Sequence, residues 1–206
     1  MPNYCDNVIY VDGTDEVKAK LRAIFESNQE PFQVLVPEPD YSKVLVPYLF
    51  PQFHNEPAKV GRYDACIDWC VQNWGTKAEP ITEVEVFNSN PLNNGDEDML
   101  AISFCTAWSP PVGICKAISK LEGVKQVFNH YGESGNDFVG STHFKDGEIT
   151  NEFVLTFQDM DEKYREGERN PIFVGVWSLF EDLIEDMREG WEEAEEEEDF
   201  LQAVNG

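Results

Sequence analysis

The chain has 206 residues, of which 41% are hydrophobic and 13% aromatic, enough apolar material for a packed core and too much for wholesale disorder. Its 40 acidic residues against 15 basic ones give a formal charge of −25, which argues against direct binding to nucleic acid or to an anionic membrane, because both need a basic surface. No apolar stretch approaches the ~18 residues of a membrane span, and the opening "MPNYCDN" is not a signal peptide, so we expect a cytoplasmic protein with reduced thiols.

A short strand and a capped helix are expected first. Residues 7–11, "NVIYV", form the strand, and Thr14 can cap the helix that follows. Val17, Leu21 and Ile24 then recur at helical spacing and predict one buried face.

A proline-rich insertion is expected next, at about residues 31–61. Residues 31–57 carry six prolines, which exclude a long helix and predict an irregular excursion with short extended pieces. A helix is expected over residues 62–74, burying Ile67, Trp74 and either Cys70 or Val71, and Gly75 stands where a left-handed cap is wanted.

The following region predicts strands and one further helix. Strands are expected over residues 82–88, 99–108 and 124–131, and a hairpin over residues 137–145 and 149–157 turns at Asp146-Gly147. Between the second and third strands, Ser109-Pro110 is typical of a helix start, with Ser109 as the cap. That helix would bury Ile114, Ile118 and Leu121.

This order predicts an α+β fold. An interrupted βαββαβ order with an extra hairpin is typical of a ferredoxin-like sandwich, which we expect over residues 1–157. Residues 158–170 are charged and predict a linker, and residues 171–206 predict an acidic amphipathic C-terminal helix. The apolar stripe of that helix would comprise Trp177, Phe180, Ile184, Met187, Trp191 and Ala194.

Four islands carry a family resemblance: "MPNYCDN" at the start, "NWGTK" at 73–77, "TAWSPP" at 106–111 and "YGESGNDFVG" at 131–140. In combination they resemble the YubB-type family of plasmid and bacteriophage proteins, over roughly residues 1–157. Tyr4 stands where that family usually has Trp. The resemblance implies a ferredoxin-like domain, no settled activity, and an accessory protein of a mobile element acting inside a bacterial host cell. It does not reach the acidic end.

The same islands offer a possible pocket for a small ligand. Trp74 and Trp108 could form stacking walls, and Lys77 could contact an anion. The glycine-rich loop adds Tyr131, Glu133 and Asp137, whose carboxylates could bind a metal or act as acid and base. A purely structural role is the alternative for each of these residues. "NWGTK" is also typical of a helix end, and the glycine-rich loop is also typical of a plain turn.

The cysteines and histidines indicate no specific chemistry. Cys66 and Cys70 would share a helix face, but without a second Cys/His pair they lack the usual zinc spacing. A catalytic pair of Cys105 with His130 is geometrically possible across a sheet, although a buried apolar cysteine is the commoner arrangement. We therefore expect neither a metal nor a cofactor.

The end of the chain concentrates negative charge. Residues 181–199 hold twelve acids and one base, Arg188, and seven like-charged pairs four residues apart would cost a helix roughly 1.5–3 kcal/mol. Over the ~28 Å of such a helix there is one charge per ~2.4 Å, close to the ~1.7 Å of duplex DNA. A solubility tail and an imitation of nucleic acid both fit this density.

The leading hypothesis is a non-enzymatic phage or plasmid protein that inhibits a basic host nucleic-acid-binding, defence-related factor through a DNA-mimicking surface, with no direct contact to nucleic acid or membrane. The partner-binding residues would be Glu181, Asp182, Glu185, Asp186, Glu189, Glu192, Glu193, Glu195, Glu196, Glu197 and Glu198. The alternatives are a ligand-binding or enzymatic core domain with a solubility tail, and a homo-oligomeric structural protein; the oligomeric state stays open.

Overall fold

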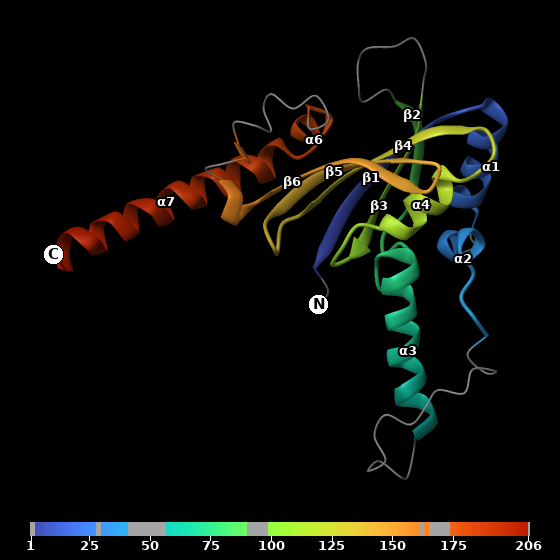
Figure 1. Ribbon diagram of the computed structural model, residues 1–206, viewed down its shortest axis with the longest axis horizontal. Helices are drawn as coiled ribbons and strands as arrows, with labels where there is room; N and C mark the ends of the chain where they lie inside the picture. The colour runs from blue at the N-terminus through green and yellow to red at the C-terminus, as the bar shows by residue number, and fades with distance from the viewer. Residues whose placement is uncertain are drawn as a thin grey trace.

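In the computed structural model, a six-stranded antiparallel sheet has helices on both of its faces (Figure 1). The structure describes residues 3–27, 30–40, 57–89, 99–160, 163–164 and 174–205. Its elements are β1 (Tyr4–Gly13), α1 (Asp15–Glu26), α2 (Pro31–Leu35), α3 (Pro57–Trp74), β2 (Glu85–Ser89), β3 (Met99–Ala107), α4 (Val112–Ser119), β4 (Val124–Glu133), β5 (Phe138–Lys145), β6 (Glu148–Thr156), the 3₁₀ turn η1 (Phe157–Asp159), α6 (Val174–Leu179) and α7 (Glu181–Asn205).

The strand order confirms the ferredoxin-like prediction. The sheet runs β2-β3-β1-β4-β5-β6, with β1 in the middle and antiparallel to both β3 and β4. Helices follow β1 and β3, so the first four strands have the βαββαβ order of that fold. The β5–β6 hairpin extends the sheet beyond β4, as the sequence indicated.

One face of the sheet builds the main hydrophobic core. Because side chains alternate along a strand, Ile9 and Val11 of β1 and Ile102 of β3 point to the same side, where they pack against Leu21 of α1 and Ile114 of α4. All five are fully buried, and each contributes about 1.5–3 kcal/mol through the apolar surface it removes from water. In Figure 1, α2, α3 and α4 lie on one side of the sheet and α6 on the other.

The first helix begins as its sequence predicts. The Thr14 hydroxyl accepts a hydrogen bond from the backbone N–H of Val17 at 3.4 Å, which satisfies one of the unpaired donors of the first turn. Val17 and Leu21 are buried as expected, but Phe25 takes the third buried position and Ile24 is only partly buried. The wider aromatic ring therefore turns the buried face by one residue.

The proline-rich insertion is more ordered at its ends than predicted. Residues 31–35 form the short helix α2, and the next helix begins at Pro57 instead of residue 62. Residues 41–56 lie outside the described residues. Gly75 follows α3 with φ of +89°, which confirms the predicted left-handed cap.

The β5–β6 hairpin turn is also confirmed. Asp146 and Gly147 have φ of +54° and +85°, the two positive values that a type I′ turn requires. The predicted cap of α4 is wrong, because the helix begins only after Pro111. The hydroxyl of Ser109 instead donates to the Gly75 carbonyl at 2.7 Å, tying the start of α4 to the end of α3.

The C-terminal region is two helices where the sequence predicts one. The backbone breaks at Phe180, between α6 and α7. The predicted linker 158–170 is described only at 158–160 and 163–164; there Met160 is fully buried and Tyr164 stacks edge-on with Trp177, with ring centroids 4.9 Å apart. The described part of this segment therefore belongs to the packed structure.

Candidate functional site

The acidic helix α7 is anchored along one stripe. Ile184 and Met187 are buried against β5 and β6 residues and Met160, while Leu183 and Trp191 are partly buried around them. Ala194, the last residue of the predicted stripe, is exposed. The anchored part thus ends near Trp191.

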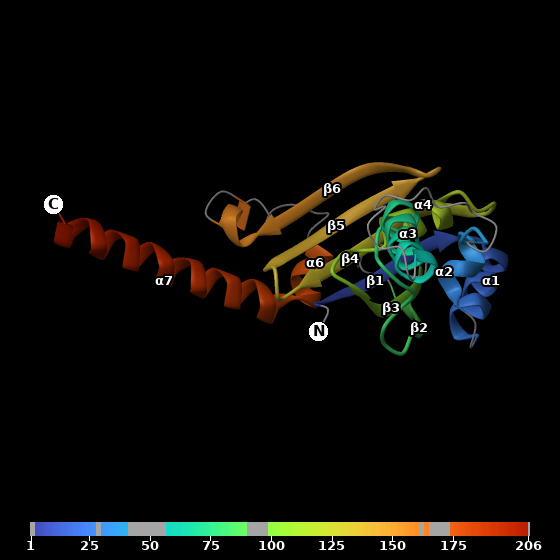
Figure 2. The ribbon, with the colours of Figure 1, turned by 90° about the horizontal axis from the view of Figure 1, so that it is seen from below.

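Beyond that point α7 leaves the rest of the protein. Figures 1 and 2 show the helix extending past the edge of the sheet, so that its C-terminal end marks one extremity of the molecule. Glu195, Glu196, Glu197 and Glu198 fall on this helical extension, and their side chains lie outside the described residues. The backbone there is helical to Asn205.

An outward row of acids runs along the anchored part. Asp182, Asp186, Glu189 and Glu193 are all exposed, and at 3.6 residues per turn they lie on the side of α7 opposite the buried stripe. We call these four residues the outer row. It rises over ~16 Å, with one carboxylate about every 5.5 Å. Glu181 is also exposed and lies in the first turn, where the helix dipole favours negative charge.

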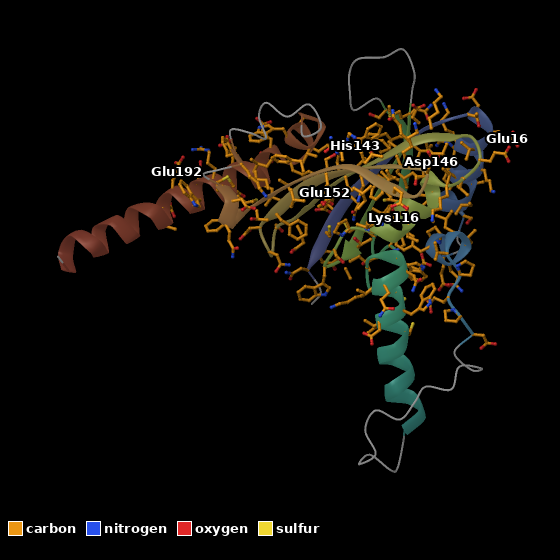
Figure 3. All side chains as sticks on the ribbon, in the orientation of Figure 1. Glu16, Lys116, His143, Asp146, Glu152 and Glu192 are labelled. Atoms are coloured by element: carbon orange, nitrogen blue, oxygen red, sulfur yellow. The ribbon has the colours of Figure 1, made fainter. Side chains whose placement is uncertain are left out.

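A second group of acids is partly neutralised by Arg188. Its guanidinium contacts Glu185 at 2.8 Å and Glu192 at 2.7 Å, and the Tyr164 hydroxyl donates to Glu185 at 2.9 Å. The hydrogen bonds from Arg188 and then Tyr164 lower the pKa of Glu185. Of the predicted partner-binding residues, these two are consequently less available as free charge than the outer row. Figure 3 labels Glu192 on α7, well away from Glu16 at the opposite end of the protein.

The predicted pocket islands meet at one end of the sheet, since Thr76 donates to the Ala107 carbonyl at 3.0 Å, but not every predicted pocket residue is exposed there. Trp74 is buried, packs edge-on against Phe32 and Trp69, and donates its indole N–H to the Val36 carbonyl at 2.8 Å. It is a core residue and cannot offer a stacking surface to a ligand. The prediction that Trp74 lines a pocket is therefore wrong.

Lys77 and Trp108 do come together. The Lys77 ammonium lies 4.7 Å from the centroid of the Trp108 ring, a cation–π contact, and the indole is 40% exposed. Trp108 has φ of +73°, which turns the chain sharply after β3 and places the ring at the end of the sheet. Its backbone N–H donates to Asn3 next to β1.

The loop residues are structural. Tyr131 is buried, with its hydroxyl 3.4 Å from Thr142 Oγ1, and burial raises its pKa to about 12. Glu133 is 1% exposed and accepts hydrogen bonds from Gly135 N and the Asn136 amide, so its carboxylate closes its own loop. Asp137 has φ of +49° and forms part of the turn into β5.

A buried histidine, His130, and a partly buried one, His143, lie on the sheet face that carries α6. His130 Nδ1 is 3.0 Å from Ser141 Oγ, and burial together with the neighbouring His143 lowers the His130 pKa to about 3. Burial lowers the pKa of His143 to about 4, and its ring stacks edge-on with Phe128. Both imidazoles are thus neutral near pH 7.

Cys105 and His130 form no catalytic pair. The Cys105 thiol donates to Asp6 at 2.7 Å, whereas the described partner of His130 is Ser141. Burial and the Asp6 carboxylate raise the pKa of Cys105 to about 11, which disfavours the nucleophilic thiolate.

A cysteine–carboxylate cluster, by contrast, was missed by sequence reasoning. Cys66 and Cys70 share a face of α3 as predicted, and both thiols donate to Glu38, at 3.3 Å and 3.5 Å. None of the five cysteines, all among the described residues, forms a disulfide. The Cys-x-x-x-Cys spacing was the only signal available, because nothing in the sequence indicates that Glu38 would fold back onto it.

Fold and sites together define an α+β protein of the ferredoxin-like class with an accessory acidic helix. Residues 89–174 are similar to a family described as the ferredoxin-like domain in Api92-like protein. The matched segment contains β3 to β6, while the central strand β1 lies outside it. The chain matches no curated protein and no solved structure. Among the described residues, none of the helices combines the length and apolar character needed to cross a membrane.

Proposed function

We propose that this protein is a non-enzymatic binding protein that presents α7 to a basic, nucleic-acid-binding partner in place of nucleic acid. The observation that carries the proposal is the outer row, four exposed acids on a helix that is anchored at its start and extends away from the sheet.

The anchoring gives the acidic face a fixed direction. A disordered acidic tail would lose conformational entropy when it binds, whereas a helix held by buried Ile184 and Met187 has already been ordered by folding. Regularly spaced carboxylates on such a helix can replace phosphates in a basic groove. They would attract the partner at long range and speed its association.

Arg188 reduces the like-charge repulsion within the helix. By bridging Glu185 and Glu192 it neutralises acids beside the outer row and leaves the row itself exposed. The same bridges stabilise the anchored part of α7. Repulsion along the helix, estimated from the sequence at roughly 1.5–3 kcal/mol, is thereby reduced.

The resemblance to YubB-type proteins of plasmids and bacteriophages supports a biological setting for this proposal. A mobile element gains when a host nuclease or another DNA-binding defence protein is occupied by a decoy. In that setting the partner is a basic host protein, and the interaction takes place in the cytoplasm of the bacterial cell.

The alternative of a ligand-binding core domain has weaker support. Of its six proposed residues, Trp74 and Tyr131 are buried in packing roles and Glu133 closes a loop. Only Lys77 and Trp108 remain as an exposed pair.

The test compares two variants of equal net charge. One reverses the outer row: Asp182→Lys, Asp186→Lys, Glu189→Lys and Glu193→Lys. The control reverses four exposed acids distant in sequence from α7: Glu16→Lys, Glu83→Lys, Glu122→Lys and Glu148→Lys. Immobilised full-length protein and both variants are exposed to bacterial lysate at ~50 and ~300 mM salt, a range over which phosphate-like contacts weaken steeply.

Captured proteins are then challenged with duplex DNA. We expect a basic protein to bind the wild type and the control variant but not the outer-row variant. Salt and DNA should both release it. Equal capture by all three proteins, or a captured protein that DNA does not displace, would contradict the proposal that α7 takes the place of nucleic acid.

A further inference from the structure

A cluster of three metal-ligating groups lies where α3 meets the segment after α2. The thiols of Cys66 and Cys70 and the carboxylate of Glu38 each offer one ligand atom, and these atoms all lie within 4.8 Å of one another. The two cysteines are one helical turn apart, so both thiols project from one side of α3 toward the same carboxylate.

The backbone around Glu38 is held in place by several contacts. Its N–H donates to Gln33 Oε1 at 2.8 Å, and two residues earlier the Val36 carbonyl accepts from the buried Trp74 indole. Earlier in the same segment, the N–H groups of Phe32 and Gln33 donate to the Glu79 carboxylate at 2.8 and 2.7 Å. These hydrogen bonds fix the start of α2. Together, the hydrogen bonds fix the backbone that leads into Glu38, whose carboxylate reaches the two thiols of α3.

The charge balance of the cluster favours a cation. Within the part of the chain that the structure describes, no ion pair is recorded for Glu38, and its carboxylate instead accepts from two thiols. A divalent ion that displaced both thiol protons would face two thiolates and one carboxylate. The net charge of the centre would then be −1, and every ligand would have a partner.

We propose that Glu38, Cys66 and Cys70 bind one zinc ion. Thiolate sulfur and carboxylate oxygen are both regular zinc ligands, and two thiolates favour zinc over magnesium or calcium. Cys70 is almost completely buried, whereas Glu38 and Cys66 are partly buried, and the fourth tetrahedral position would be filled by water. Binding is balanced as Zn²⁺ plus two thiols giving a zinc dithiolate and two protons.

The consequence for the fold is a link between the insertion and the core domain. A zinc ion here would join the segment after α2 to α3 through three bonds, in addition to the packing of Trp74. This role is independent of α7 and of the function proposed for it.

The test uses the full-length chain with Zn²⁺ and Co²⁺ as probes, in excess Mg²⁺ so that the acidic surface holds no zinc. We expect one zinc per chain in competition with a chelator, release of about two protons per zinc, and a thiolate-to-metal charge-transfer band with tetrahedral Co²⁺. Cys66→Ser should weaken zinc binding at least ~100-fold, and the conservative Glu38→Gln about 10–100-fold.

The matched control is Cys105→Ser, which removes another thiol that donates to a carboxylate but lies outside the three-residue cluster. It should bind zinc as the wild type does, and circular dichroism checks that every variant is folded. Stoichiometry far below one, a cobalt spectrum without the thiolate band, or a folded Glu38→Gln variant with wild-type affinity would overturn the zinc site.

Discussion

His130, which is buried, and His143, which is partly buried, make stability depend on pH. An unfolded histidine titrates near pH 6.5, whereas burial lowers the folded pKa to about 3 for His130 and about 4 for His143. Between these values the unfolded chain binds protons that the folded chain does not. The free energy of unfolding is therefore fully retained above pH ~6.5 and falls as the pH decreases toward 4 and 3.

The size of this effect at pH 5 is nearly independent of the folded pKa. There the unfolded histidine is almost fully protonated and the folded one almost fully neutral, so the buried His130 contributes a loss of about 2 kcal/mol relative to pH 8, a sizeable part of the stability of an ordinary domain. His143 is more exposed, and solvent screening makes its loss smaller. Tyr10, which stacks on His130, stays neutral throughout because burial raises its pKa to about 12.

The assay is urea unfolding followed by tryptophan fluorescence at several pH values from 8 to 5. His130→Asn keeps a polar atom near Ser141 but removes the titration, so its loss of stability over this range should be about 2 kcal/mol smaller than that of the wild type. The acidic residues titrate in both proteins and cancel in the comparison. Parallel loss of stability in wild type and variant would refute the assignment of a buried, neutral His130.

Two further predictions concern packing. Gly113→Ala should lower the free energy of unfolding by about 1–3 kcal/mol, because its Cβ would overlap the Asn73 carbonyl where α3 meets α4. The matched Gly190→Ala on α7 would place its Cβ in ordinary van der Waals contact, 3.5 Å from Phe157 Cε2, and should be neutral or stabilise by up to ~1 kcal/mol. Trp74→Phe should cost about 2–4 kcal/mol through a cavity and a carbonyl without its donor, whereas Trp108→Phe at the exposed end should cost less than ~1 kcal/mol. Denaturation midpoints measure all four, and a Trp108 variant as damaging as the Trp74 one would contradict the placement of the two rings.

Local chemistry allowed most of the fold to be predicted. The Thr14 cap, the Gly75 cap and the Asp146-Gly147 turn depend on neighbouring residues, and each formed as expected. Ser109 failed as a cap, because the helix begins only after Pro111 and the Ser109 hydroxyl donates to the Gly75 carbonyl instead. That contact joins residues distant in sequence, so no local pattern contains it.

The candidate sites were harder to predict because they depend on burial and on distant contacts. Tyr131 and Glu133 look like exposed loop residues, yet both sheet faces are covered at this point and both side chains are buried. Glu38 joins Cys66 only through the path of the chain between α2 and α3. The stripe of α7 was predicted as far as Trp191 because it follows helical periodicity, whereas the break at Phe180 was not.

The central position of β1 has a consequence for synthesis on the ribosome. Ile9 pairs with Ile102 on one side and Asn129 on the other, so neither neighbour of the first strand exists until much of the chain has been translated. The apolar strand β1 therefore stays unpaired until β3 and then β4 have left the ribosome. Completion of the sheet is thus a late step that is dominated by non-local contacts. Until then the nascent chain exposes an aggregation-prone strand edge, which chaperones of the cell can protect.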